Sequence, residues 1–173
     1  MIRKKNRYVK PRKLYIKTRI KEENVLLNKY GLKSKREIWK TAAKINYFRK
    51  RAMALAKSSK EEQGLLFDKL KRIGLRTDTT ADVLALKVED LLERRLPIIV
   101  FKKGLARTPQ QARQMIVHKK VLIDGKVVNI PSYIVSLDEE PAIGVKPAKQ
   151  KKAAVKKEET PENPAAESVE AVQ

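Results

Sequence analysis

The residues best able to do chemistry lie between Glu93 and Val135, and the chemistry that they favour is anion binding. Arginines, lysines and the single histidine cluster at the joints of this stretch, and Asp124 is its only acid from Pro97 to Ser136. Such clusters are typical contacts for nucleic-acid phosphates. The alternative is a small α/β unit with a merely solvated basic face. The candidate contacts here are Arg94, Arg95, Arg107, Thr108, Gln111, Arg113, Gln114, His118, Lys119 and Lys120.

No catalytic set accompanies these cations. The chain has no cysteine and His118 is its only histidine, so Ser-His-Asp and Cys-His sets and a structural zinc site lack their residues. Asp138, Glu139 and Glu140 are adjacent, and we interpret them as a solvated cluster at the fraying end of a domain. We therefore expect no enzyme activity, no metal, no other cofactor and no small-molecule substrate.

The same stretch predicts the elements that position its cations. Thr108 is placed to cap a helix, Pro109 suits its first position, and Gln111 sits where a capping box has Gln or Glu. Asp124-Gly125 between two β-branched runs predicts a hairpin, because both turn residues must reach positive φ. The apolar face of the helix consists of Ala112, Met115 and Ile116.

A preceding helix is expected to pack on this one. We expect the contact to use Ile98, Ile99, Leu105, Ala112 and Ile116. Packed in this way, the two helices place six cations on one side. These are Arg94, Arg95, Arg107, Arg113, Lys119 and Lys120. Pro97 predicts that the first helix kinks or restarts there.

Several short segments occur in a fixed order: Arg94-Arg95-Leu96, Gly104 to Thr108, Gln111 to Gln114, His118-Lys119, and Ile123 to Tyr133. Together they resemble the RNA-binding domain family named after the small-subunit ribosomal protein "S four". The segments from Tyr30 to Leu32 and from Lys35 to Lys40 resemble the archaeal and eukaryotic form of that ribosomal protein. The resemblance covers most of the chain to about Pro147. It implies that structured RNA lies against the capped helix and the residues entering the hairpin.

Composition points to the same class of partner. The 173 residues include 41 lysines and arginines against 20 acids, a formal net charge of +21. Such an imbalance indicates a polyanion, with nucleic acid as the leading candidate and an anionic membrane surface as the runner-up. No apolar run is long enough to span a membrane, so we expect a cytoplasmic protein.

The N-terminal half supplies further candidates. Residues 1–20 contain no acid, and tyrosines interrupt their charges, so we expect an arm that orders on RNA, the alternative being a solubilising tail. Its candidate contacts are Arg3, Arg7 and Arg12. A helix from Glu22 to Tyr30 should end at Gly31. Ser34 and Glu37 predict a capping box that opens a long helix over 35–57. Its apolar seam is Ile38, Ile45, Phe48, Ala52 and Leu55, and its basic face is Lys40, Lys44, Tyr47 and Arg51.

Residues 61–96 are nearly balanced in charge and are predicted to form a scaffold. Ser59 and Glu62 predict a cap for a helix that ends at Gly74, and Thr79-Thr80 starts a shorter one. Their apolar stripes are Leu65, Leu66, Leu70 and Ile73, then Val83, Leu84 and Leu86. After Ser136 the hydrophobic pattern fades, and the Lys/Ala-rich and then Glu/Pro/Ala-rich tail predicts disorder.

We therefore expect an α+β protein with a mainly helical N-terminal part. The predicted divisions are a basic arm at 1–20, a helical domain at 21–92, two helices on a short antiparallel sheet at 93–145, and a tail at 146–173. The resemblance implies a structural constituent of the small ribosomal subunit that binds its rRNA, nucleates assembly, and lies beside other ribosomal proteins near the path by which mRNA enters. The alternatives are a non-ribosomal RNA-binding factor and an RNA-modifying enzyme that uses the same domain.

Overall fold

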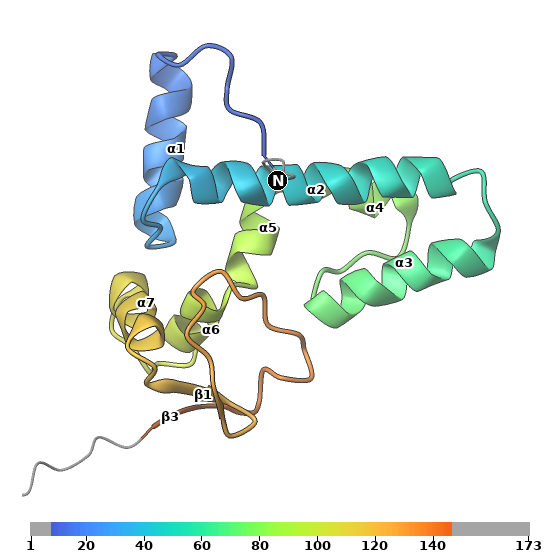
Figure 1. Ribbon diagram of the computed structural model, residues 1–173. Coiled ribbons are helices and arrows are strands. Elements are labelled where there is room, and N and C mark those ends of the chain that lie inside the picture. Colours follow the sequence, from blue (N-terminus) through green and yellow to red (C-terminus); the bar gives the residue numbers. More distant parts are fainter. Residues whose placement is uncertain (1–7, 147–173) are drawn as a thin grey trace, which may run out of the picture.

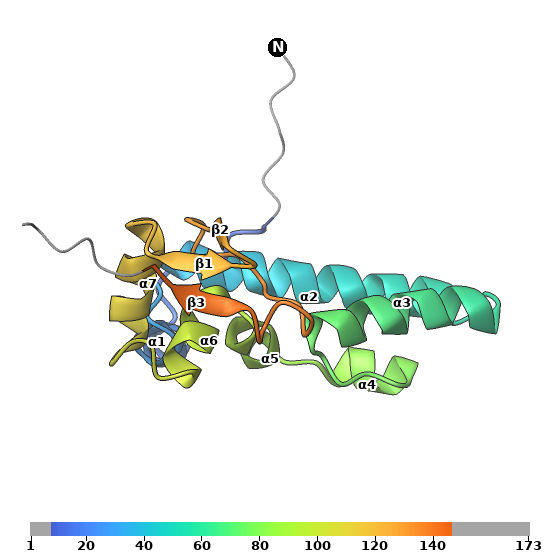
Figure 2. The ribbon, with the colours of Figure 1, turned by 90° about the horizontal axis from the view of Figure 1, so that it is seen from below.

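A computed structural model describes residues 8–146 and shows an α+β fold, as the sequence predicts. In this part of the chain, seven helices precede the three strands, and a long arm of α2 and α3 projects away from a smaller unit made of α6, α7 and the sheet (Figures 1 and 2). The helices are α1 (Lys17–Lys29), α2 (Lys35–Leu55), α3 (Lys60–Ile73), α4 (Thr80–Ala85), α5 (Val88–Glu93), α6 (Leu96–Lys102) and α7 (Pro109–Val117). The strands are β1 (Val121–Ile123), β2 (Lys126–Val127) and β3 (Ile143–Val145).

The predicted helix ends at Gly31 and Gly74 are confirmed. Gly31 has φ +58° and Gly74 has φ +89°, the left-handed region that glycine reaches without a Cβ penalty. The start predicted for the first helix is wrong, because α1 begins at Lys17 and so includes part of the stretch assigned to the arm. Glu23 accounts for the extra turn, since it pairs with Arg19 one turn earlier and accepts a hydrogen bond from Trp39 of α2.

The apolar seam of α2 is confirmed. Four of its residues, Ile38, Ile45, Phe48 and Ala52, are buried. Leu55 packs against the core that contains the last three, whereas Ile38 packs with Tyr30, Leu32 and Leu92. Two members of the stripes predicted for the next helices are wrong: Leu65 is 72% exposed and Leu84 is 44% exposed. The core of the arm closes without them, because α2 and α3 meet α4 and α5 through Leu66, Leu70, Val83 and Leu91.

The hairpin is confirmed, and its sheet is larger than predicted. Asp124 and Gly125 have φ of +49° and +75°, as a two-residue hairpin turn requires. Strand β3 pairs antiparallel with β1 on the side away from β2, which gives the order β2-β1-β3. We did not predict β3, because a three-residue strand containing Gly144 carries no alternating pattern.

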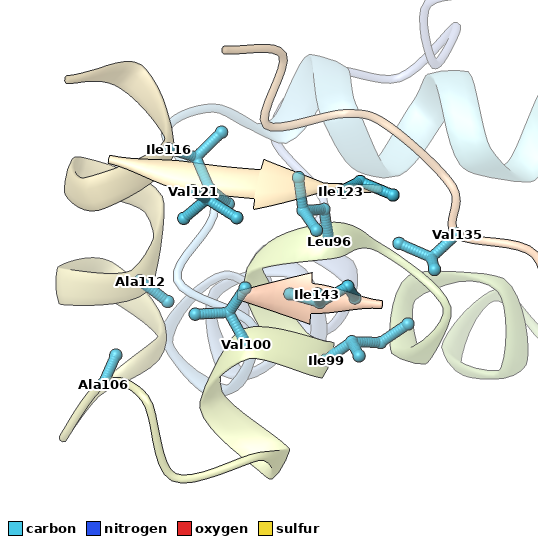
Figure 3. Packing of buried hydrophobic residues seen from close by; sticks show 10 residues of the cluster. All are labelled: Leu96, Ile99, Val100, Ala106, Ala112, Ile116, Val121, Ile123, Val135 and Ile143. Carbon is cyan, nitrogen blue, oxygen red and sulfur yellow. The ribbon is translucent and has the colours of Figure 1, made fainter. Parts of the chain in front are cut away.

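The core of this smaller unit lies between the two short helices α6 and α7 and the sheet (Figure 3). Ile116 of α7 lies beside Val121 of β1, Ala112 of α7 points toward Val100 of α6, and Val100 points toward Ile143 of β3 (Figure 3). Two predicted packing residues are wrong here. Ile98 packs instead with Tyr30, Leu32 and Leu92 at the base of α1, and Leu105 is 37% exposed.

Pro97 restarts the chain as a helix, as predicted. Helix α5 ends at Glu93, Arg95 is extended with φ −75° and ψ 143°, and α6 begins at Leu96 with the proline in its first turn. Proline is tolerated there because its missing N–H would have no helical partner. The consequence is a bend that separates Arg94 from Arg95.

Candidate nucleic-acid interface

The side chain of Glu37 joins α2 to the smaller unit. Its Oε1 accepts a hydrogen bond from Nη2 of Arg113 at 2.7 Å, and its Oε2 accepts from Nη1 of Arg113 at 3.0 Å and from Nη2 of Arg95 at 2.7 Å. The capping box predicted for Ser34 and Glu37 is therefore wrong: Ser34 makes no side-chain cap, and the carboxylate is used elsewhere. We call Glu37, Arg95 and Arg113 the clamp.

Backbone pairing holds Arg95 in the clamp. The extended residue lies opposite Ile134 in an isolated antiparallel bridge. On either side of it, the N–H of Leu96 donates to the carbonyl of Tyr133 at 2.9 Å, and the N–H of Val135 donates to the carbonyl of Arg94 at 3.0 Å. The segment after the hairpin thus holds the backbone of Arg95, while Glu37 holds its guanidinium.

Burial strengthens the electrostatics of the clamp. The side chains of Arg95, Glu37 and Arg113 are 6%, 18% and 21% exposed. Burial raises the pKa of the Glu37 carboxyl, but the hydrogen bonds and charges of Arg113 and Arg95 outweigh it, so the pKa lies below its ordinary value. Glu37 is therefore a carboxylate at neutral pH, and a bidentate partner for Arg113.

A cavity of about 310 Å³ opens beside the clamp. Lys40 and Lys44 of α2 border it together with the three clamp residues, and the rest of its wall consists of Thr41, Leu91, Pro131, Ser132 and Ile134. The pKa of the Lys44 ammonium is lowered by burial and by the nearby charge of Lys69. The structure thus brings together four of the predicted contacts, from two parts of the chain: Lys40, Lys44, Arg95 and Arg113.

Arg94 does not join them, and the prediction that all six cations share one side is wrong for this residue. Its Nε donates to the carbonyl of Ile73 at 2.8 Å, its Nη2 donates to the carbonyl of Val135 at 3.2 Å, and its Nη1 pairs with Glu140 at 2.9 Å. The guanidinium ties the end of α3 to the segment that leads into β3.

Two residues of the acidic cluster that was expected to be solvated, Glu139 and Glu140, make specific contacts instead. Glu139 accepts hydrogen bonds from the hydroxyl of Tyr133 and the N–H of Ser136, and Glu140 holds Arg94. These acids are structural, since they fasten the chain before β3. Within residues 8–146, no three histidine, aspartate or glutamate side chains gather closely enough to hold a metal ion.

The start of α7 uses its polar residues for capping. Thr108 Oγ1 accepts from the N–H of Gln111 at 3.2 Å, which confirms the predicted cap, and the Gln111 side chain accepts from the N–H of Arg107 at 2.9 Å. The charged side chain of Arg107 remains exposed, as does Gln114 farther along the helix.

The end of α7 presents His118, Lys119 and Lys120, all exposed. The N–H of Lys119 donates to Ile116 and that of Lys120 donates to Met115, the bonds of a Schellman motif. Lys119 therefore occupies the left-handed position, with φ +58°. Glycine is the usual residue at this position of a helix end.

The remaining candidates lie apart from the cavity. Tyr47 and Arg51 are exposed farther along α2, where they border a second cavity of about 330 Å³ against α3. Arg12 is exposed before α1. Arg3, Arg7 and the C-terminal tail lie outside the residues that the structure describes.

Sequence reasoning missed Glu37 and Ser132 as parts of this site. An acid within a basic stretch is one signal for Glu37, but its partners lie 58 and 76 residues away, so no local spacing identifies them. Ser132 has no signal beyond its place in the segment after the hairpin.

No helix among the described residues has the length and apolar character needed to cross a membrane.

The chain is similar to known ribosomal proteins. Residues 94–140 match the S4 domain family. Over 147 residues the chain is 47% identical to the small ribosomal subunit protein uS4 of Methanococcus aeolicus, a match that covers 81% of this chain and 83% of the relative. The uS4 protein of Saccharolobus islandicus is 47% identical over 133 residues, which are 73% of this chain and 74% of the relative.

Proposed function

The chain belongs to the family of the small ribosomal subunit protein uS4, and we propose that it binds small-subunit rRNA through the cations of α2 and α7. The family is one of structural ribosomal proteins, so the chain is a constituent of the small subunit and no enzyme. Its place is the ribosome. The RNA-modifying enzyme considered as an alternative is thereby excluded.

The observation that carries the rRNA proposal is the meeting of two cationic surfaces at one clamp. Lys40 and Lys44 come from α2 and Arg113 from α7, yet all border one cavity. The phosphates of an RNA strand crossing this junction would meet cations from both parts. Phosphate contacts supply affinity, and the fixed distance between the two parts supplies selectivity for a folded RNA junction.

The same proposal includes three further claims, on assembly, on protein neighbours and on position in the subunit. The chain binds rRNA early and so helps to nucleate assembly of the subunit, it contacts neighbouring ribosomal proteins, and it lies near the path by which mRNA enters. The scaffold of α3 and α4 supports the protein contacts, because its surface carries acids such as Glu61, Glu62 and Asp82 in place of a uniform positive charge.

Crosslinking in cells tests this function. RNA attached to the chain is sequenced and the linked peptides are located. We expect links to one small-subunit rRNA junction from both the Lys40–Arg51 part of α2 and the Arg107–Lys120 region, with links to mRNA and to small-subunit proteins in lower number. Links scattered over tRNA and mRNA would overturn the proposal that the chain binds a small-subunit rRNA junction.

Retention on washed subunits distinguishes a ribosomal constituent from the remaining alternative, a factor that binds ribosomes only transiently. A constituent remains on salt-washed subunits at one copy each, whereas a transient factor is lost. Salt also tests the electrostatic basis of binding in vitro. With ~6–10 phosphates neutralised, affinity for the rRNA junction should fall by about 10³ to 10⁵ between 50 and 200 mM salt. A salt slope near zero would contradict phosphate contact.

A further inference from the structure

Residues 158–173 differ in charge from the rest of the chain. They contain no lysine or arginine, although the chain as a whole has a net charge of +21. Their acids are Glu158, Glu159, Glu162, Glu167 and Glu170. Phosphates repel such a segment, so the proposed rRNA contacts give these acids no role. Their charge instead suits a cationic surface of the same chain. We call residues 158–173 the acidic segment.

The described part of the chain ends beside the basic end of α7. Strand β3 pairs with β1 so that Val145 lies opposite Val121, and the N–H of Lys146 donates to the carbonyl of Lys120 at 2.8 Å. Residues 147–157 separate this point from the acidic segment. A coil of that length spans a root-mean-square distance of about 17–20 Å, whereas the nine residues of α7 extend over only about 14 Å. Both ends of α7 are therefore within reach of the acidic segment.

Exposed cations without an acid partner lie at both ends of α7. Arg107 precedes the helix, and His118, Lys119 and Lys120 follow it. Within residues 8–146, none of these four side chains forms an ion pair. We call these four side chains the α7 surface. It offers positive charge that the folded part of the chain leaves unneutralised.

We propose that the acidic segment binds the α7 surface in the RNA-free chain and is displaced when RNA binds there. Complementary charge is the basis of the contact. Each exposed ion pair is weak, but the connection through residues 147–157 holds the segment at an effective concentration in the millimolar range. Val169 and Val172 add apolar surface of a kind that suits Val117, which is 52% exposed at the end of α7.

The consequence for RNA rests on the proposed function. An RNA that needs the α7 surface must displace the acidic segment, whereas an RNA that contacts only α2 need not. The apparent affinity is lowered in proportion to the fraction of time that the surface is free. If the surface is free for about 10–30% of the time, the Kd for the rRNA junction is raised about three- to tenfold.

Carbodiimide crosslinking of the full chain tests the contact without RNA, because the reagent joins a carboxylate only to an amine that touches it. Isotope-labelled and unlabelled copies are mixed at low salt, and the linked peptides are identified by mass spectrometry. We expect links within one copy from the acidic segment to Lys119 or Lys120. Lys57 and Lys60 are the matched control, since both are exposed and flank the turn between α2 and α3, at the end of the arm far from α7 (Figures 1 and 2).

Four outcomes of the crosslinking would overturn the proposal. They are the absence of links from the acidic segment, links confined to the lysines of residues 147–157, equal yields at the control lysines, and links formed only between labelled and unlabelled copies. The last of these would mean that the segment binds a second copy of the chain.

RNA titration at 50 mM salt tests the displacement. Replacing all five glutamates of the acidic segment by glutamine should lower the Kd for the rRNA junction by about three- to tenfold. In a Lys119→Gln, Lys120→Gln background the same replacements should lose most of this effect, because the two sets of side chains interact. In the matched Lys57→Gln, Lys60→Gln background the effect should persist.

The two backgrounds separate docking from simple repulsion. An effect of equal size in both would mean that the acids repel RNA from a distance, and it would overturn the proposal, as would no effect in the unaltered chain. Failure of the unaltered chain to bind the RNA at all would refute the proposed function, while the crosslinks would still decide whether the acidic segment binds the α7 surface.

Discussion

Replacing Glu37 by glutamine tests whether the clamp holds α2 to the smaller unit. The change removes one charge and almost no volume, and it leaves Arg95, with a side chain only 6% exposed, without its carboxylate. Breaking a buried ion pair from one side costs about 3–5 kcal/mol. Because Glu37 is 18% exposed and Arg113 21%, water recovers part of this, and we expect a loss of about 2–4 kcal/mol. For a chain of this size that corresponds to a melting temperature lower by about 4–16 °C.

The pH dependence provides the sharper assay. The folded pKa of Glu37 lies below its ordinary value of 4.5. A group with a lowered folded pKa contributes stability that is present above the unfolded pKa and is lost as the pH falls through the folded one. Urea unfolding should therefore show the full difference between the unaltered chain and Glu37→Gln at pH 7. The difference should shrink progressively below about pH 4.5.

Glu22→Gln is the matched control for this experiment. Glu22 is exposed, and its side chain makes no ion pair or hydrogen bond among residues 8–146. Its replacement changes the net charge equally, so it should alter stability by no more than about 0.5 kcal/mol. Equal unfolding midpoints for the two variants, or a difference that persists undiminished at pH 3, would refute the reasoning.

Three other changes test separate features. Ile116→Ala, at a fully buried position, should cost about 2–5 kcal/mol in urea unfolding, whereas Val117→Ala, at a half-exposed neighbour, should cost about 0.5 or less. Gly74→Ala should lower the melting temperature, because its Cβ would lie 2.6 Å from Nε of Arg94 at a φ of +89°. Lys119→Gly relieves about 1–2 kcal/mol of backbone strain and adds about 0.4–1 kcal/mol of unfolded-chain freedom. It should therefore keep or raise stability while weakening rRNA binding in gel-shift titrations, and undiminished binding would remove Lys119 from the proposed contacts.

Local signals predicted much of the fold. The left-handed glycines at 31 and 74, the cap at Thr108 and the Asp124-Gly125 hairpin were correct, because each depends on residues within a few positions of one another. Strand β3 was missed because it does not depend on residues close to it in the sequence. Its three residues acquire their conformation from pairing with β1 across the sheet. The sequence of β3 carries no alternating pattern that would indicate this pairing.

The candidate site was predicted less completely than the fold. Residue types identified cations able to meet phosphates, and four of them do lie around one cavity. Their arrangement followed from tertiary contacts. Arg94 and Arg95 are neighbours in sequence, but the turn before Pro97 sends one to the end of α3 and the other to Glu37. Whether these residues contact RNA stays a prediction.

The clamp explains why a protein of net charge +21 places a half-buried carboxylate among the cations of this junction. Without Glu37, Arg95 and Arg113 would repel each other across the junction, and α2 would have no charged tie to α7. With it, two arginines that could each bind phosphate are held by one acid at short, directed distances. In the proposed rRNA complex, selectivity for a folded RNA depends on a fixed separation of the cationic surfaces, and repulsion among cations alone would widen that separation. The proposed binding therefore gives the acid at the junction a role in recognition, because it fixes the spacing of the cations on either side of it.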